Sequence, residues 1–188
     1  MTVVGTEFAM NDRKKLIEKL IKADEQLETV QLGGIKQMIF EFLIKEKLFE
    51  PEEIETNSEF KITIGDREII IHIDFIVNLP SASFMVIQCS SSSLEAWERY
   101  VISFARVIKE YQIPYAVVTD GEDAHIIDVL AGRLIGESLD KLFNRQEALN
   151  KMKDFKKIPC PANRVEKGKR IVYAFEGIKC PTTKNSKE

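Results

Sequence analysis

Three polar residues on two apolar segments could do chemistry on a metal ion or a phosphate. Asp74 interrupts the apolar run 68–78, and Gln88 and Ser90 close the run that begins at residue 84. Alternate residues of a strand share a face, so Gln88 and Ser90 lie on the same side of their segment. If the two segments are neighbouring strands, the three groups converge at one end of a sheet.

Asp74 is the strongest of these signals, because a carboxylate inside an apolar strand needs a partner and is hard to explain as ordinary core. Mg²⁺ is held by carboxylates, carbonyl oxygens and waters, and the amide oxygen of Gln88 could ligate it without contributing charge. Ser90 supplies no positive charge, whereas one charged group that stabilises a developing oxyanion is typically worth on the order of 10²- to 10³-fold in rate. Arg99, in the following predicted helix, is the nearest cation in sequence that could supply such a charge.

Simpler interpretations stay open for the neighbours of Asp74. Gln88 and Ser90 could serve the entry to a loop and the capping of the next helix. His72 is more often a hydrogen-bonded strand histidine than a base. Cys89 alternates toward the opposite face, and no pattern of His or acid around it would activate a thiolate, so a small core residue is expected.

The segments around these residues predict an α/β sandwich on a mixed sheet. A strand at 84–88, a helix at 94–111 and a strand at 115–119 form a crossover unit, which implies parallel pairing of the two strands. The remaining strands are expected at 59–64 and 68–77, joined as a hairpin by Gly65-Asp66, and at 125–129.

The flanking segments are expected to be mainly helical and divide the chain into three parts. Gly33-Gly34 separates two predicted helices at 13–28 and 35–47. The expected parts are an N-terminal helical arm (1–29), a core (30–145) and a basic C-terminal extension (146–188). A short helix is predicted at 134–152, across the boundary between the core and the extension. The extension is also expected to contain a turn at 166–168, a strand at 169–175 and a disordered tail at 181–188.

Composition is that of an ordinary globular protein. The chain has 188 residues, 44% apolar and 30% charged, with a net charge of −3. No apolar run approaches the roughly 18 residues of a membrane span, and no signal peptide is recognisable, so we expect a cytoplasmic protein without membrane association. Three cysteines suit neither a disulfide framework nor a zinc site, although Cys160 and Cys180 could pair. No phosphate-binding loop or dinucleotide fingerprint is present.

The C-terminal segment carries a local excess of positive charge. Residues 151–188 hold eleven Lys or Arg against four acids. Such a segment can bind phosphate backbones by releasing counterions, or it can be a solvated charged surface. The candidate nucleic-acid-binding residues are Lys153, Lys156, Lys157, Arg164, Lys167, Lys169 and Arg170.

Residues His72-Ile-Asp74-Phe, Phe84-Met-Val-Ile-Gln88-Cys-Ser90 and Pro114-Tyr-Ala-Val-Val-Thr-Asp-Gly121 resemble one known family. Over about residues 30–140 the chain looks like the N-terminal nuclease domain of type I restriction enzyme R subunits. The resemblance implies a restriction-endonuclease-like three-layer sandwich of the PD-(D/E)xK superfamily, whose members cut DNA with Mg²⁺. DNA is the implied partner, and a homodimer is an open alternative.

The resemblance also assigns roles by motif position. Asp74 takes the place of the metal-binding Asp, Gln88 that of the Glu, and Ser90 that of the catalytic Lys. The backbone carbonyl of Cys89 takes the place of a further metal ligand, and Glu41 on the preceding helix is the candidate supporting acid. Because Glu-x-Lys is replaced by Gln-Cys-Ser, we expect Mg²⁺-dependent cleavage to be weak or lost. The alternatives are a catalytically inactive nucleic-acid- or protein-binding module of this fold, and a purely structural partner in an oligomer.

Overall fold

The sheet has six strands in the order of the sequence. The computed structural model describes residues 4–179, and the side chains of residues 15–176. β3 and β4 pair in parallel, and every other neighbouring pair is antiparallel. The strands are β1 (Ile54–Ile64), β2 (Arg67–Leu79), β3 (Ala82–Cys89), β4 (Tyr115–Thr119), β5 (Ala124–Asp128) and β6 (Arg133–Gly136).

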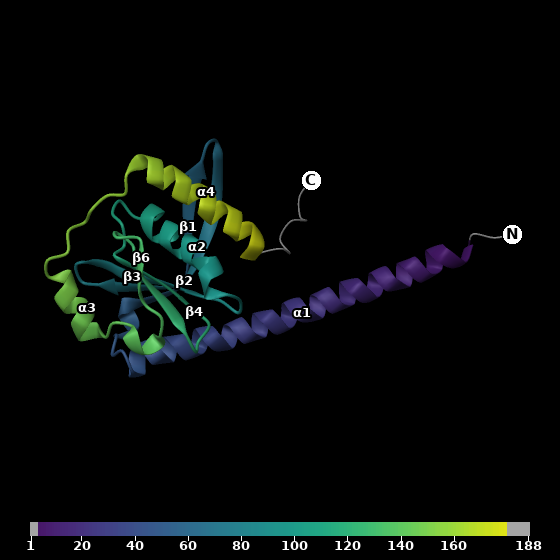
Figure 1. Cartoon of the computed structure of the whole chain (residues 1–188), viewed down its shortest axis with the longest axis horizontal. Coiled ribbons are helices and arrows are strands. Elements are labelled where there is room, and N and C mark those ends of the chain that lie inside the picture. Colours follow the sequence, from purple (N-terminus) through teal and green to yellow (C-terminus); the bar gives the residue numbers. More distant parts are fainter. Residues whose placement is uncertain (1–3, 180–188) are drawn as a thin grey trace.

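Helices cover both faces of this sheet, which gives three layers (Figure 1). One core cluster joins the sheet to the C-terminal part of α1 and to α3, and the other joins it to α2 and α4. The expected α/β sandwich with a mixed sheet flanked by helices is confirmed. The helices are α1 (Val4–Lys45), α2 (Leu94–Val107), α3 (Arg145–Met152) and α4 (Ala162–Lys179), with short 3₁₀ turns η1 (Pro51–Glu53) and η2 (Leu139–Lys141).

The central part of the sheet follows the sequence pattern closely. β1 and β2 form the expected hairpin, and the β3–α2–β4 crossover brings its strands together in parallel. In the antiparallel β2–β3 pair, Phe75 lies opposite Ile87. The next residues along, Asp74 and Gln88, are therefore cross-strand neighbours.

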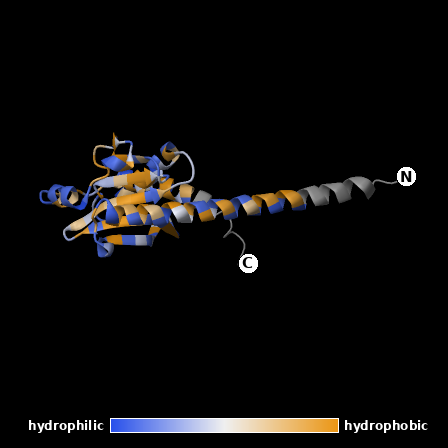
Figure 2. Cartoon of the chain, turned by 90° about the horizontal axis from the view of Figure 1, so that it is seen from below, coloured by the Kyte–Doolittle hydropathy of each residue, from blue (hydrophilic) through white to orange (hydrophobic). Residues whose placement is uncertain are grey.

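The N-terminal helix differs from the prediction of two helices. α1 is one continuous helix of 42 residues that begins at Val4 and runs through Gly33 and Gly34. A glycine inside an exposed helix costs only about 1 kcal/mol relative to alanine, which does not stop a helix whose end is anchored. The anchor is the buried row Ile35, Ile39 and Leu43. The rest of α1 projects well beyond the body of the molecule (Figures 1 and 2).

The expected strand at 169–175 is wrong, because these residues lie within α4. Gly168, interpreted as part of a turn, is a close-packing position: a Cβ there would lie 2.8 Å from Cγ1 of Val107 on α2. Val172, one turn later, is fully buried in the same contact. The β-branched and aromatic composition suggested a strand, but the apolar residues recur at helical spacing.

One further segment differs from its prediction, and two predictions fall on residues that the structure does not describe. Residues 134–152, expected to be a short helix, form most of β6, the turn η2 and α3. The predicted tail at 181–188 and the Cys160–Cys180 pairing lie outside the described residues. Within residues 4–179, no helix combines the length and apolar character needed to cross a membrane.

Candidate functional site

Asp74 and Gln88 meet at the end of the β2–β3 pair, as the alternation pattern indicated. Both are almost fully buried, with 6% and 4% of their surface exposed. The side-chain amide of Gln88 donates to Oδ2 of Asp74 at 2.6 Å, and the backbone N–H of Cys89 donates to the same oxygen at 2.7 Å. One carboxylate oxygen of Asp74 is thus held by two neutral donors from β3.

The other oxygen of Asp74 is held by a cation that the sequence analysis did not identify. Nζ of Lys36 lies 2.6 Å from Oδ1 of Asp74, and the Lys36 side chain is 30% exposed. Lys36 follows Ile35, the first buried residue of the anchoring row of α1, so its stem leaves the helix toward the sheet. Its position next to that buried row is the feature of the sequence from which Lys36 could have been identified as a residue near the sheet.

This arrangement does not fit a Mg²⁺ centre. The carboxylate of Asp74 is neutralised by Lys36 and accepts hydrogen bonds on its second oxygen. The carbonyl oxygen of Cys89, the further ligand implied by the motif, accepts a bond from the amide of Gln88 at 2.9 Å. Mg²⁺ needs anionic oxygens in an octahedral shell, and one paired carboxylate supplies too little charge. Among the described residues, no group of three or more His, Cys, Asp or Glu is arranged to hold a metal ion.

Ser90, at the motif's lysine position, bonds to its own loop. Its hydroxyl accepts from the backbone N–H of Ser92 and lies 3.0 Å from the Ser92 hydroxyl. Trp97 donates its indole N–H to that Ser92 hydroxyl at 3.1 Å. Ser90 therefore organises the entry to α2, which is the simpler of the two interpretations left open for it.

Glu41, the candidate supporting acid, faces elsewhere. It accepts hydrogen bonds from Lys45 at 2.8 Å and Gln37 at 3.3 Å, and the bond from Lys45 lowers the pKa of this carboxyl. Five residues separate it from Lys36, which is a rotation of roughly 140° about the helix axis. Glu41 lines a separate hollow along α1. Arg99, the cation that the sequence analysis considered for this site, is an exposed residue of α2. The cation that lies beside Asp74 is Lys36.

Asp74, Gln88 and Ser90 line a cleft of about 1070 Å³ between α1 and the end of the sheet. The charged residues of its wall are two lysines, Lys22 and Lys36, and four acids, Glu25, Glu28, Glu59 and Asp74. This excess of negative charge disfavours a phosphate backbone in the cleft.

Cys89, on the wall of the same cleft, is not a nucleophile. Burial, followed by the charge of Asp74, raises the pKa of its thiol, so the thiol stays protonated.

The C-terminal part of α4 is tied to β2 beside the cleft. Glu176 accepts from the backbone N–H of His72 at 2.9 Å and from the hydroxyl of Tyr100 at 2.7 Å. The same hydroxyl bonds to the carbonyl oxygen of His72. Burial raises the pKa of Tyr100. His72 is a hydrogen-bonded strand histidine, and this network fixes how α4 lies on the body.

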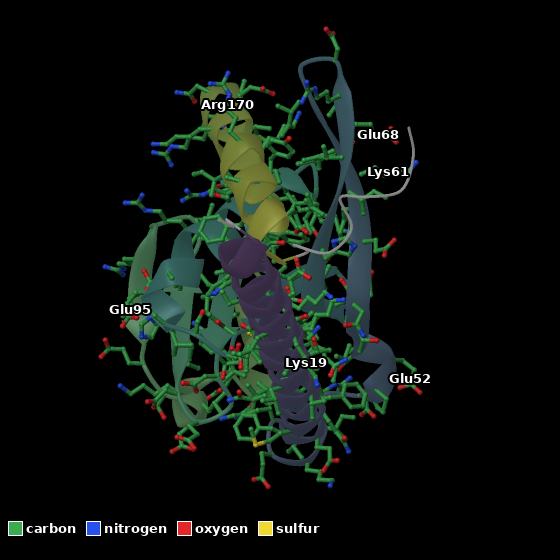
Figure 3. The ribbon with its side chains drawn as sticks, turned by 90° about the vertical axis from the view of Figure 1, so that its right-hand side faces the viewer. Lys19, Glu52, Lys61, Glu68, Glu95 and Arg170 are labelled. Atoms are coloured by element: carbon green, nitrogen blue, oxygen red, sulfur yellow. The ribbon has the colours of Figure 1, made fainter. Side chains whose placement is uncertain are left out.

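Most of the predicted basic residues form an exposed row, here called the basic surface, along the 153–161 connection and the first turns of α4. None of its members makes an ion pair with an acid of the described residues. Lys169 is not a member, because it is half-buried and its ammonium lies 3.3 Å from Glu166. Figure 3, which labels Arg170, shows nitrogen-tipped side chains extending from α4 into solvent. The basic surface comprises Lys153, Lys156, Lys157, Arg164, Lys167 and Arg170.

Comparison with known proteins adds one finding. Residues 34–142, more than half of the chain, match the family model described as type I restriction enzyme R protein N terminus. No curated protein and no solved structure gave a match. The matched residues include Lys36, Asp74 and Gln88, whereas the basic surface lies after them.

Proposed function

The chain belongs to the type I restriction enzyme R protein N-terminal family, and we propose that it is a DNA-binding module of that family that has lost cleavage chemistry. Two regions support the two halves of this proposal. The paired carboxylate at Asp74 supports the loss of cleavage, and the basic surface supports DNA binding.

The ion pair between Lys36 and Asp74 is the observation that carries the proposal. In a metal-dependent nuclease the carboxylate must be available to the cation, and the cation polarises phosphate and water. Here the charge of Asp74 is balanced by Lys36, and Gln88 brings an amide where a second carboxylate would be needed. The arrangement favours a structural role for a position that the resemblance assigns to metal binding.

DNA binding is assigned to the basic surface because its cations make no ion pair with an acid among residues 15–176. Lysine and arginine side chains that meet phosphates release condensed counterions, which gives affinity without sequence readout. The acidic wall of the cleft repels a phosphate backbone, so the duplex is expected on α4 and the 153–161 connection and outside the cleft.

The binding half is tested by charge reversal at Lys167→Glu with Arg170→Glu. With a labelled duplex, fluorescence anisotropy should give an affinity at least about tenfold weaker, and the slope of log affinity against log salt should fall by about 2. The matched control is Lys45→Glu with Lys61→Glu, which makes the same change in net charge at exposed residues that pair with acids elsewhere.

The control pair should retain most of the affinity. Equal losses in both pairs would show that net charge alone governs binding, and the absence of duplex binding even at low salt would overturn the proposal. For the cleavage half, supercoiled plasmid should remain intact with Mg²⁺ or Mn²⁺ in excess. Nicking that disappears in Asp74→Ala would overturn it.

A further inference from the structure

The projecting part of α1 exposes an apolar row that its own domain does not cover. From residue 15 to residue 31 no side chain is buried, yet six large apolar side chains are 48% to 75% exposed. Leu16 and Leu20 are 58% and 57% exposed, and Leu27 and Val30 are 68% and 75% exposed. Figure 2 shows hydrophobic bands along this part of the helix, beyond the body.

The row has the spacing of a coiled-coil seam. Leu16, Leu20, Ala23, Leu27 and Val30 are separated by four, three, four and three residues, the alternation of the d and a positions of a heptad. The row continues into Gly34 at the next a position. Two further exposed apolar residues, Ile17 and Ile21, lie beside the seam at the e and b positions.

The seam points away from the helix's own domain. The face of α1 that lines the cleft carries Lys22, Glu25, Gln26, Glu28, Thr29, Leu32 and Lys36, and Val30 of the seam lies at the edge of this face. At 100° per residue, the centre of the seam lies on the order of 140° from the centre of that face. A second helix can therefore lie along the seam while each domain stays on the outer side of its own helix.

We propose that two copies of this chain associate through a parallel, in-register, two-stranded coiled coil over about residues 16–34. An unsupported helix in water is marginal even at this length, and identical seams bury each other's leucines. Near Ile35 each helix turns its buried row toward its own sheet, and the coil ends there.

The flanking charges favour the parallel arrangement. With Leu20 and Leu27 at a, Lys19 falls at g and Asp24 at e, and a g residue meets the following e residue of the partner helix in a parallel coil. Each dimer then gains two Lys19–Asp24 contacts. Gln26 at g meets Gln31 at e in the same way. In an antiparallel coil g meets g and e meets e, so Lys19 and Asp24 would not meet.

Sedimentation equilibrium of the full chain over a range of concentrations tests the association. The wild type should be a dimer, and Leu20→Glu with Leu27→Glu should weaken the dimer at least 100-fold. The matched control, Ile21→Glu with Thr29→Glu, adds the same charge off the seam and should remain dimeric. All four positions are on the exposed part of α1, so the globular body stays folded. A wild type that is monomeric at every concentration, or a leucine variant that still dimerises, would overturn the proposal.

Orientation is tested by cross-linking. In a chain carrying Cys160→Ser and Cys180→Ser, Leu20→Cys should oxidise readily to a disulfide-linked dimer, since identical a positions face each other only in a parallel, in-register coil. The charge pair gives a second readout: Lys19→Glu should weaken association and Lys19→Glu with Asp24→Lys should restore it. A dimer that neither cross-links at Leu20→Cys nor responds to the charge exchange would contradict the parallel arrangement.

Discussion

The centre at Asp74 and the basic surface differ in whether their charges are paired. At Asp74 a buried carboxylate is held by Lys36, by the amide of Gln88 and by a backbone N–H, and none of its charge is left for a ligand. On the basic surface, exposed cations make no ion pair with the acids that the structure describes. Asp74, Gln88 and Lys36 lie within the residues that match the family model, whereas the exposed cations of the basic surface lie outside them.

The largest effect is expected from Asp74→Ala. This change leaves the Lys36 ammonium and two N–H donors without their acceptor, and breaking a mostly buried ion pair in this way typically costs about 3 kcal/mol of unfolding free energy. Duplex affinity at equal salt should not change. Urea unfolding and anisotropy on the same protein measure both quantities; a loss of DNA affinity in the folded variant would mean that the two regions are not separate.

Gly168→Val should come next and affects the other region. Its side chain would collide with Val107 and push α4 from α2, which is an overpacking change worth about 2 kcal/mol. Because α4 carries the basic surface, DNA affinity should fall together with stability. Ala174→Val, on the exposed side of α4, is the control and should be near neutral in both measurements. Unchanged affinity in Gly168→Val would remove α4 from the DNA contact.

Lys36→Met should cost less than Asp74→Ala, about 1 to 2 kcal/mol, because Lys36 is partly exposed and water can solvate the carboxylate that it leaves. A double-mutant cycle between the two positions isolates their interaction. A coupling energy near zero would mean that the ion pair contributes nothing to stability. The charge of Asp74 would then be as little involved in holding the fold together as the charges of the basic surface.

The smallest effect, with the opposite sign, is expected from Gly33→Ala. A Cβ at this position meets nothing within 4 Å, and alanine favours the helix by about 0.5 to 1 kcal/mol. Thermal unfolding followed by circular dichroism should show a small gain in stability. A loss would indicate that α1 bends here to deliver Lys36 to the centre.

The sequence predicted the centre in part. Period-two alternation put Asp74 and Gln88 on faces of two strands that can meet. They lie opposite each other only because a register shift between Val77 and Asn78 moves the β2–β3 pairing by one residue from the register set at the hairpin turn, and the sequence analysis did not foresee that shift. Lys36 could not be assigned, since its reach to Asp74 depends on how α1 is rotated on the sheet. Treating Gly33 and Gly34 as a break removed the continuity that fixes this rotation. The same uncertainty placed Glu41 in the centre, although it faces another way.

In the C-terminal region, predictions made from residue type alone differ from the structure. The basic residues at 153–170 were identified from charge alone, but their exposure and the pairing of Lys169 with Glu166 needed coordinates. Val172 and Phe175 were read as a strand because of their type, while Gly168 was read as a turn. Only the contact between α4 and α2 explains the glycine.

Thermal unfolding with and without Mg²⁺, compared between the wild type and Lys36→Met with Gln88→Glu, tests most directly whether Lys36 and Gln88 keep a metal ion from Asp74. A cation at concentration c that binds only the folded state stabilises it by RT ln(1 + c/Kd), so the melting temperature rises with the cation concentration. We predict no Mg²⁺-dependent rise for the wild type, and a rise for Lys36→Met with Gln88→Glu, which frees Asp74 and supplies the second carboxylate; Asp74→Ala should abolish that rise. A rise in the wild type that depends on Asp74 would contradict the account.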